Sequence, residues 1–223
     1  MLVAARDEAE LIAGTVGALR GALPGAAVWV ADDGSRDGTA AAAARAGATV
    51  LPAGGRIGKG GAMTMLARRA LDASSASSSA DPVFLLCDGD LADSAAALPA
   101  LVDAVLRDEA DVAVAVFATR RGGGVGAAVG FARWALRDLT GAGARAPISG
   151  QRAMRARTLR RMLPFARGYG MELAMSIDAT RAGMRILELE LDLSHRVTGR
   201  SPGGFAHRAR QLADFVRVYL RRR

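Results

Sequence analysis

The sequence predicts an α/β protein with a doubly wound, mostly parallel sheet and helices on both faces of that sheet. Short apolar runs alternate with helical patterns through the first half of the chain, as they do in βαβ units. Such runs are typical of strands that are covered on both sides. Acidic or glycine-rich segments follow several of the runs, at the sheet edge where open α/β folds bind ligands.

Apolar runs and turn residues locate the elements of the first half. Strands are predicted at residues 2–5, 28–31, 49–51, 83–87 and 111–116. Helical spacing predicts the helices between them at residues 12–23, 39–46, 62–73 and 94–107. Asp7 and Glu10 resemble a capping box at the start of the first helix. Residues 74–80 are rich in serine and alanine and predict a solvated loop.

The pattern changes after Phe117. Spacing predicts the remaining elements as helices at 126–140, 158–163 and 171–181, a strand at 185–191 and a helix at 205–223. The last helix is basic and amphipathic, with Arg210, Arg217 and Arg221 on one face. Its apolar face is predicted from Phe205, Ala209, Leu212, Val216 and Tyr219. We therefore expect one domain, 1–204, with halves 1–117 and 118–204, followed by the helix 205–223.

Composition narrows the class of protein. The 223 residues suffice for one sizeable core, and the net charge of +8 favours anionic partners such as phosphates or anionic lipids. The arginines are scattered and aromatic residues make up only 4%, which argues against nucleic-acid binding. Cys87 is the only cysteine, so we expect no internal disulfide and interpret it as a small apolar filler. Without a signal peptide or a long charge-free run, the sequence predicts a cytoplasmic protein.

The most informative segment is the end of the 83–87 strand, where Asp88, Gly89 and Asp90 follow an apolar run. Side chains two residues apart leave a strand on the same side, so both carboxylates reach the carboxyl edge of the sheet. Such oxygen ligands suit Mg²⁺ or Mn²⁺, and the metal is commonly shared with substrate phosphates. An acidic turn without a ligand is the alternative, because Asp-x-Asp alone is a weak signal.

Two further loops carry polar residues at strand ends. The segment 32–39, Asp-Asp-Gly-Ser-Arg-Asp-Gly-Thr, either binds a base or ribose hydroxyl through its carboxylates or only caps the next helix. Lys59, the only lysine of the chain, lies in a Gly-Lys-Gly-Gly segment before a helix. The spacing differs from that of a Walker P-loop, which argues against an ATPase, but the lysine can hold a diphosphate. A solvated loop lysine is the alternative.

The second half offers three more candidates. Glu172 lies in the first turn of the helix 171–181, where it either compensates the helix dipole or faces substrate hydroxyls. His195 and Arg196 follow the strand 185–191. His195 is a candidate third metal ligand and Arg196 a candidate phosphate clamp, with a structural histidine as the alternative.

In their order along the chain, these segments resemble the nucleotide-sugar-dependent glycosyltransferases of the GT-A fold, family 2 above all. The resemblance covers roughly residues 3–200. Within the family, the chain is similar to two groups of enzymes: the dolichol- or polyprenol-phosphate-mannose synthase-like enzymes and the glucosyl-3-phosphoglycerate synthase-like enzymes. The matching segments are 4–8, 32–39, 58–60, 88–90, 149–153 and 168–172. The resemblance implies a GT-A (Rossmann-like) fold with a nucleotide-binding half, 1–117, and an acceptor half, 118–204.

The resemblance also implies roles for individual residues. It assigns the nucleotide sugar to Ala5, Glu8, Asp33, Lys59 and Asp88. It assigns a divalent metal, Mg²⁺ or Mn²⁺, to Asp88, Asp90 and His195. Asp90 and Glu172 are the catalytic candidates, with Glu172 facing the sugar or acceptor. The candidates for the acceptor phosphate are Arg120, Arg121, Arg152 and Arg196.

The expected activity is metal-dependent transfer of a hexose from a nucleotide-diphosphate sugar to a phosphorylated acceptor. The segment 165–172 with the later His-Arg pair favours a small phospho-acid such as 3-phosphoglycerate, whereas 149–153 favours a polyprenyl phosphate. Two other classes stay open. A sugar-phosphate nucleotidyltransferase is disfavoured because Ala-Arg-Asp-Glu, and not a glycine-rich basic loop, follows the first strand; the other class is a non-catalytic nucleotide-sugar-binding module.

The sequence leaves two further partners undecided, a membrane and a second copy of the chain. The helix 205–223 either contacts the inner membrane face peripherally or packs on the domain, since its basic face suits anionic lipid. A homodimer is also left open.

Overall fold

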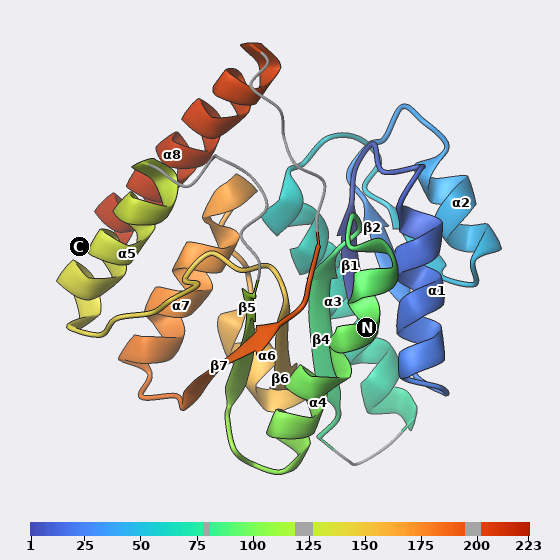
Figure 1. The fold of residues 1–223 in the computed structure, drawn as a ribbon, viewed down its shortest axis with the longest axis horizontal. Coiled ribbons are helices and arrows are strands. Elements are labelled where there is room, and N and C mark those ends of the chain that lie inside the picture. The colour runs from blue at the N-terminus through green and yellow to red at the C-terminus, as the bar shows by residue number, and fades with distance from the viewer. Residues whose placement is uncertain (78–80, 119–126, 195–201) are drawn as a thin grey trace.

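The computed structural model describes residues 1–77, 81–118, 127–194 and 202–223. Within these residues the strands form one sheet with helices on both sides (Figure 1). The strands are β1 (Leu2–Ala5), β2 (Trp29–Asp32), β3 (Thr49–Pro52), β4 (Val83–Asp88), β5 (Val112–Phe117), β6 (Arg152–Arg155) and β7 (Ile186–Leu191). Their order in the sheet is β3-β2-β1-β4-β6-β5-β7, and every pair is parallel except those made by β6. The predicted doubly wound, mostly parallel sheet is confirmed.

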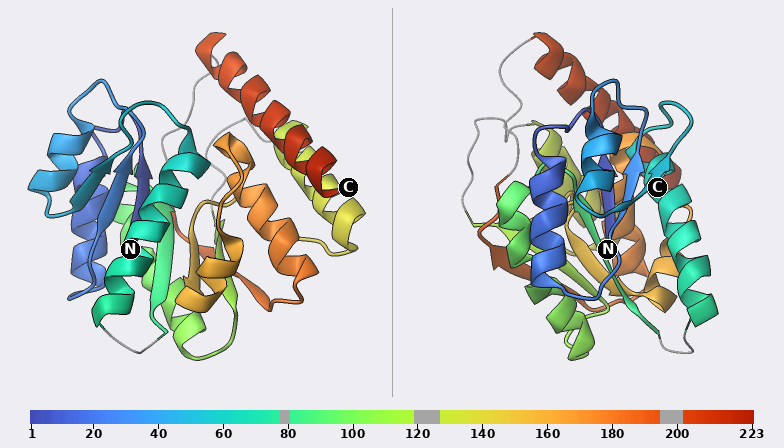
Figure 2. Two further views of the ribbon diagram at one scale, coloured as in Figure 1. Left: turned by 180° about the vertical axis from the view of Figure 1, so that it is seen from behind. Right: turned by 90° about the vertical axis from the view of Figure 1, so that its right-hand side faces the viewer.

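The helices cover the sheet in layers, which the two views of Figure 2 show from behind and from the side. They are α1 (Ile12–Ala22), α2 (Thr39–Arg45), α3 (Lys59–Ser77), α4 (Pro99–Leu106), α5 (Ala127–Thr140), α6 (Ala156–Met162), α7 (Met171–Arg181) and α8 (Pro202–Arg222), with short 3₁₀ turns η1 (Ala92–Ala97) and η2 (Gly168–Gly170). Helices α1, α2 and α4 share one core with the sheet, and α3, α6 and α7 share the other. Alternate residues of β1–β6 therefore face opposite cores, whereas β7 contributes only to the first.

Strand β6 is absent from the sequence-based prediction. It lies antiparallel between β4 and β5, with Arg152 opposite Leu86 on one side and Val114 on the other. Its sequence, Arg-Ala-Met-Arg, lacks an apolar run, because both of its ends are arginines. The burial of Arg152 depends on the tertiary structure, so no local sequence pattern predicts this strand.

One predicted cap and two predicted helix boundaries differ from the structure. Helix α1 begins at Ile12 after Leu11, which makes no side-chain cap, so the predicted capping box of Asp7 and Glu10 does not form. Asp7 instead has φ +55° and accepts a hydrogen bond from the amide of Arg36 at 2.9 Å. Helix α3 continues through Ser77, beyond the predicted loop start at residue 74. The predicted helix 94–107 is divided into η1 and α4, with Pro99 as the first residue of α4.

The C-terminal helix packs on the domain. Phe215 and Val218 of α8 are buried against α5 and α7, in a cluster that includes Leu136 and Ile177. The predicted apolar face is displaced from this contact, because Val216 and Tyr219 are only partly buried. Phe205 lies outside the side chains that the structure describes, and Ala209 is exposed. The helix meets the domain through positions spaced i, i+3 around Phe215.

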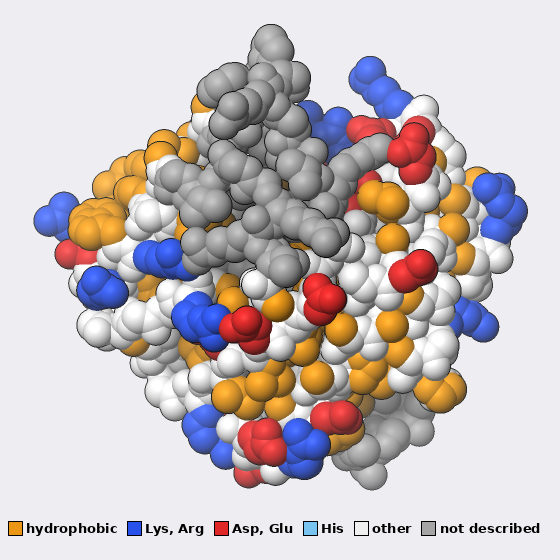
Figure 3. Space-filling model, in the orientation of Figure 1, with side chains coloured by type: hydrophobic (Ala, Val, Ile, Leu, Met, Phe, Trp, Pro, Cys, Tyr) orange, Lys and Arg blue, Asp and Glu red, His pale blue; other side chains and the backbone are white. Residues whose placement is uncertain are grey.

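Polar contacts hold the same helix along its length. Arg222 forms a bidentate ion pair with Asp178 of α7 at 2.6 and 2.7 Å, and the hydroxyl of Tyr219 donates to Asp138 of α5 at 2.9 Å. Figure 3 shows hydrophobic side chains gathered over α5 and α8 at the left of the molecule, next to basic ones. Within 1–77, 81–118, 127–194 and 202–223, the helices are too short or too polar to cross a bilayer.

Cys87 is buried in β4, in agreement with its expected role as an apolar filler. Burial, reinforced by the neighbouring carboxylate of Asp88, raises the pKa of the Cys87 thiol to about 12. The thiol should therefore react with a thiol-specific reagent at about pH 8 at least ~100-fold more slowly in the native protein than in guanidinium chloride.

The same pKa shift predicts a pH dependence of stability. The unfolded thiol ionises near its ordinary pKa of about 9 while the native thiol stays protonated to about 12, so the free energy of unfolding should fall as pH rises through this window. Urea titrations of the native chain and of Cys87→Ala over this range measure the effect. An identical pH slope for both proteins would contradict it.

Candidate functional site

The carboxyl ends of β1, β2 and β4 meet at one edge of the sheet. Parallel pairing sets Ala5 beside Asp32 and Ala4 beside Asp88. The segments that follow these strands, which carry Glu8, Asp33 and Asp90, therefore begin next to one another. This edge is where the sequence predicted the site.

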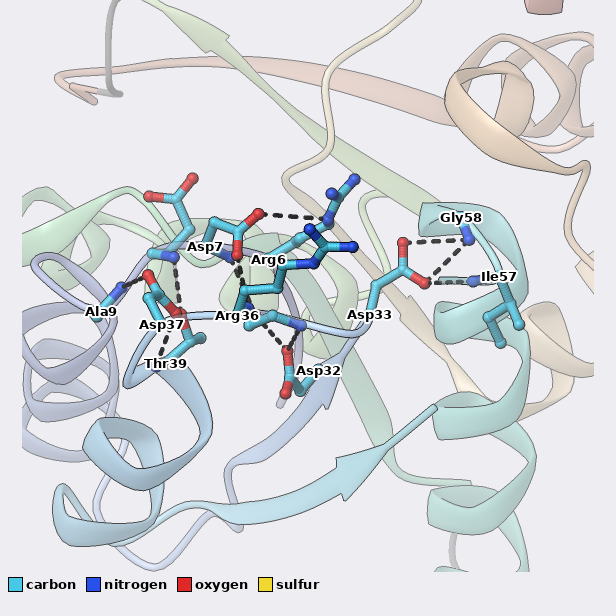
Figure 4. Close-up of polar contacts among 12 residues, drawn as sticks. Arg6, Asp7, Ala9, Asp32, Asp33, Arg36, Asp37, Thr39, Ile57 and Gly58 are labelled. Carbon is cyan, nitrogen blue, oxygen red and sulfur yellow. Dashed lines mark hydrogen bonds and ion pairs between the residues drawn. The ribbon is translucent and has the colours of Figure 1, made fainter. Parts of the chain in front are cut away.

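Asp33 anchors the loop that leads into α3. Its carboxylate is buried and accepts hydrogen bonds from the amides of Ile57, at 2.7 Å, and Gly58, at 2.9 and 3.1 Å (Figure 4). Gly34 permits the approach, because a Cβ there would lie 3.0 Å from the carbonyl carbon of Gly55. These contacts place Lys59 as the first residue of α3. The predicted contact of Asp33 with a nucleoside stays a prediction.

The segments 5–9 and 32–39 are joined by hydrogen bonds between side chains and backbone (Figure 4). The amide of Asp7 donates to Ser35 Oγ at 3.0 Å, and the amide of Arg36 donates back to Asp7 Oδ1 at 2.9 Å. The amide of Glu8 donates to Thr39 Oγ1 at 2.8 Å. The polar residues of 32–39 therefore stabilise the two loops by hydrogen bonds, and they hold Ala5 and Glu8 near Asp33.

Lys59 lies at the centre of the site. Its Nζ is 2.5 Å from Asp88 Oδ1 at the end of β4 and 2.5 Å from Glu172 Oε1 in the first turn of α7. The side chain of Glu172 is only 6% exposed. Burial disfavours the charge of Lys59, but the two carboxylates outweigh this effect and raise the pKa of Lys59 above its ordinary value. The structure thus brings together three predicted residues as a cation between two carboxylates.

Gln151 is a site residue that the sequence analysis did not single out. Its Nε2 donates to Asp88 Oδ2 at 2.9 Å, and its Oε1 accepts from Ser149 Oγ at 3.1 Å. A Cβ on Gly150 would lie 2.6 Å from Asp88 Oδ2 and 2.9 Å from Lys59 Nζ, so a side chain there would displace this ion pair. The only signal for this role was the membership of 149–153 among the matching segments.

The sequence analysis named Arg152 as a candidate contact of the acceptor phosphate, and the structure buries this side chain. Its guanidinium is buried and donates to the carbonyl oxygens of Ser149 at 2.8 Å, Pro147 at 3.0 Å and Glu172 at 3.1 Å, and to Ser176 Oγ at 2.9 Å. Burial lowers its pKa to about 10, which still leaves the group charged at neutral pH. Strand alternation turns this side chain toward the face that α7 covers. Arg152 therefore joins the 147–149 turn to α7.

Of the three predicted metal ligands, the structure describes two, Asp88 and Asp90. Asp88 and Asp90 are partly buried at the sheet edge and supply carboxylate oxygens, the donor type that Mg²⁺ and Mn²⁺ prefer. Among the residues that the structure describes, no group of three His, Cys, Asp or Glu side chains is placed to hold a metal ion. The other predicted residues, His195, Arg196, Arg120 and Arg121, lie outside the described residues. Asp88 and Asp90 have the donor chemistry for a divalent cation, but Asp88 here pairs with Lys59 and Gln151. The metal site of Asp88, Asp90 and His195 therefore stays a prediction.

Several solved structures that are similar to this chain are complexes of one enzyme. Glucosyl-3-phosphoglycerate synthase from Mycobacterium tuberculosis in complex with Mn²⁺, UDP and phosphoglyceric acid is 26% identical with a TM-score of 0.80, over 99% of this chain and 76% of that chain. The complex of that synthase with Mg²⁺ and UDP is 27% identical with a TM-score of 0.77, over 99% and 77%. Its complex with Mn²⁺, UDP-glucose and glycerol 3-phosphate is 26% identical with a TM-score of 0.74, over 99% and 78%.

A comparison with curated protein sequences finds no match. The family model for glycosyl transferase family 2 matches residues 1–159, most of the chain. This match and the solved structures confirm the predicted family and enzyme class, a nucleotide-sugar-dependent glycosyltransferase. The chain belongs to glycosyl transferase family 2.

Proposed function

We propose that this chain transfers glucose from UDP-glucose to a small phosphorylated acid such as 3-phosphoglycerate, with the help of Mg²⁺ or Mn²⁺. The observation that carries the proposal is the Lys59 ammonium between Asp88 and Glu172 at the carboxyl edge of the sheet. The similar synthase was solved with UDP-glucose, Mn²⁺ and phosphoglyceric acid, and its fold covers 99% of this chain. The donor and acceptor named for that synthase support the same pair here.

The donor would lie against residues 1–117. Ala5 and Glu8 are held beside Asp33 at the ends of β1 and β2, where they can contact a nucleoside. Lys59 supplies a fixed positive charge near the diphosphate, and such preorganised charge stabilises a leaving group as it becomes more negative. Asp88, Asp90 and His195 would hold the divalent cation, which as a Lewis acid would further neutralise the departing diphosphate.

The acceptor would lie against residues 118–204. Glu172, as a carboxylate paired with Lys59, can accept a hydrogen bond from a hydroxyl of the sugar or of the acceptor. Buried Arg152 fixes Glu172 from behind through the carbonyl oxygen of that residue. Because Arg152 is buried, the proposed phosphate contacts are Arg120, Arg121 and Arg196.

A polyprenyl phosphate is the second candidate acceptor. Trp134 of α5 is 50% exposed and Leu220 of α8 is 63% exposed. Figure 3 shows basic side chains beside the hydrophobic ones over these two helices. Such a combination suits peripheral contact with an anionic membrane. The packing of α8 through Phe215 and Val218 favours the small acceptor, because these two apolar side chains are buried in the domain and are not free to enter a membrane.

The test is an assay of UDP release from UDP-glucose with Mn²⁺ and either 3-phosphoglycerate or a polyprenyl phosphate. We expect release that requires 3-phosphoglycerate and is abolished by a chelator. Asp90→Asn should lower the rate by about 100-fold or more, because it weakens the site for the cation that offsets leaving-group charge.

Asp93→Asn is the matched control for this assay. It changes an exposed carboxylate three residues further along the chain and should leave the rate within about twofold. Release that requires only the polyprenyl phosphate would replace the first proposal by the second. Full activity of Asp90→Asn would overturn the metal assignment.

A further inference from the structure

The turn η2 fixes the direction of Glu172. Gly168–Gly170 runs directly into Met171, the first residue of α7, and Glu172 follows in the first helical turn. Gly168 has φ +61°, a conformation that residues with a side chain rarely adopt. A displacement of this turn would therefore move Glu172 relative to Lys59 and Asp88.

The inner side of the turn rests on the start of α3. A Cβ on Gly60 would lie 1.8 Å from the carbonyl oxygen of Ala166, and a Cβ on Gly58 would lie 3.5 Å from Cα of Gly168. The backbone before the turn thus touches the backbone on either side of Lys59. The amide of Phe165 adds a hydrogen bond to Thr64 Oγ1 at 3.0 Å.

The outer side of the turn rests on α8. The amide of Tyr169 donates to Asp214 Oδ2 at 3.1 Å, and the side chain of Asp214 is only 19% exposed. A Cβ on Gly168 would lie 2.2 Å from the same oxygen, and a Cβ on Gly170 would lie 2.5 Å from Val218 Cγ2. The turn is therefore packed between α3 and α8, and a side chain at Gly168 or Gly170 would displace Asp214 or Val218.

We propose that Asp214 is a positioning residue of the transferase: by holding the turn η2 against α3, it sets the separation of Glu172 and Lys59. The C-terminal helix then supports the candidate active site from outside, through the turn η2. This helix lies beyond residues 1–159, which the family model matches. This inference rests on the proposed function for its effect on rate, but the contact that carries it is independent of any substrate.

Asp214→Ala tests the proposal. The variant should lower kcat for glucose transfer by about 10- to 100-fold, since small misplacements of groups near the reacting atoms cost this much. The KM for UDP-glucose should change by less than about threefold, because Asp33 and the loop it anchors are untouched. Hydrogen exchange of the Tyr169 amide should accelerate by about tenfold. Asp214→Asn keeps an oxygen acceptor and should recover most of the rate.

Asp178→Ala is the matched control. It breaks the ion pair that α8 forms through Arg222 and leaves Asp214 and the turn in place. It should lower the thermal midpoint about as much as Asp214→Ala does, with kcat within about twofold of wild type. Equal losses of kcat in the two variants, or unchanged exchange at Tyr169 in Asp214→Ala, would overturn the proposal. If wild type transfers no sugar, the proposed function fails, and the exchange measurement alone decides whether Asp214 holds the turn.

Discussion

Replacement of Lys59 by methionine is expected to lower kcat/KM for sugar transfer by about 100- to 1000-fold. The substitution keeps an unbranched side chain but removes the charge that separates the carboxylates of Asp88 and Glu172, each 2.5 Å from Nζ. Losses of this size follow when a preorganised charge or donor is taken from developing negative charge in a transition state. Glu172 would also be left as a buried carboxylate beside a second one, which adds to the disturbance.

Steady-state kinetics with UDP-glucose and circular dichroism measure the effect and check that the fold is retained. Arg69→Met is the matched control, because it removes an exposed cation from the same helix and should leave kcat/KM within about twofold. Lys59→Arg should recover little activity, since a planar guanidinium does not occupy the position of a compact ammonium. Wild-type kinetics in Lys59→Met would remove Lys59 from the donor site.

The raised pKa of Lys59 predicts how the stability of the fold changes with pH. Its folded-state pKa lies above the ordinary value of 10.5, so its contribution to stability is complete below that pH and is lost only as pH rises beyond it. An alkaline loss of stability that begins well below pH 10 should therefore be the same in wild type and in Lys59→Met.

Replacement of Arg152 by methionine should destabilise the fold by about 3–5 kcal/mol, because several buried acceptors would each lose a donor at a cost of about 1–3 kcal/mol. Methionine fits the apolar surroundings but cannot donate to the carbonyl oxygens of Pro147, Ser149 and Glu172. For a chain of this length the loss corresponds to a fall in Tm of about 6–20 °C. Calorimetry and urea titration measure it.

Arg155→Met is the comparison for this variant. Arg155 lies on the same strand but is less buried, and its contacts to backbone carbonyl oxygens of Asp81, Val105 and Leu106 are longer, at 3.3–3.4 Å. It should cost about 1 kcal/mol. A phosphate-binding Arg152 would instead give an unchanged Tm and a raised KM for the acceptor, so the two assignments have opposite signatures.

Local patterns predicted the elements that have strong periodicity. The strand at 2–5 and the helix at 171–181 occur at the predicted bounds, because buried apolar runs and helical spacing reflect contacts that each segment makes as a whole. Polar segments were less predictable. Asp7 was expected to cap α1 and instead accepts from Arg36, since a carboxylate satisfies whichever amide the tertiary fold brings near it.

The sequence by itself determined the fold class and the sheet edge at which the site lies. Periodicity and the acidic strand end at Asp88 are local properties, and the common direction of parallel strands brings their carboxyl ends to one place. Only the tertiary structure decided that Lys59 pairs with both Asp88 and Glu172, that Arg152 turns inward, and that Asp214 of α8 supports the turn before α7. Those contacts join residues far apart in the chain, and they depend on how helices pack over the sheet, which no short stretch of sequence specifies.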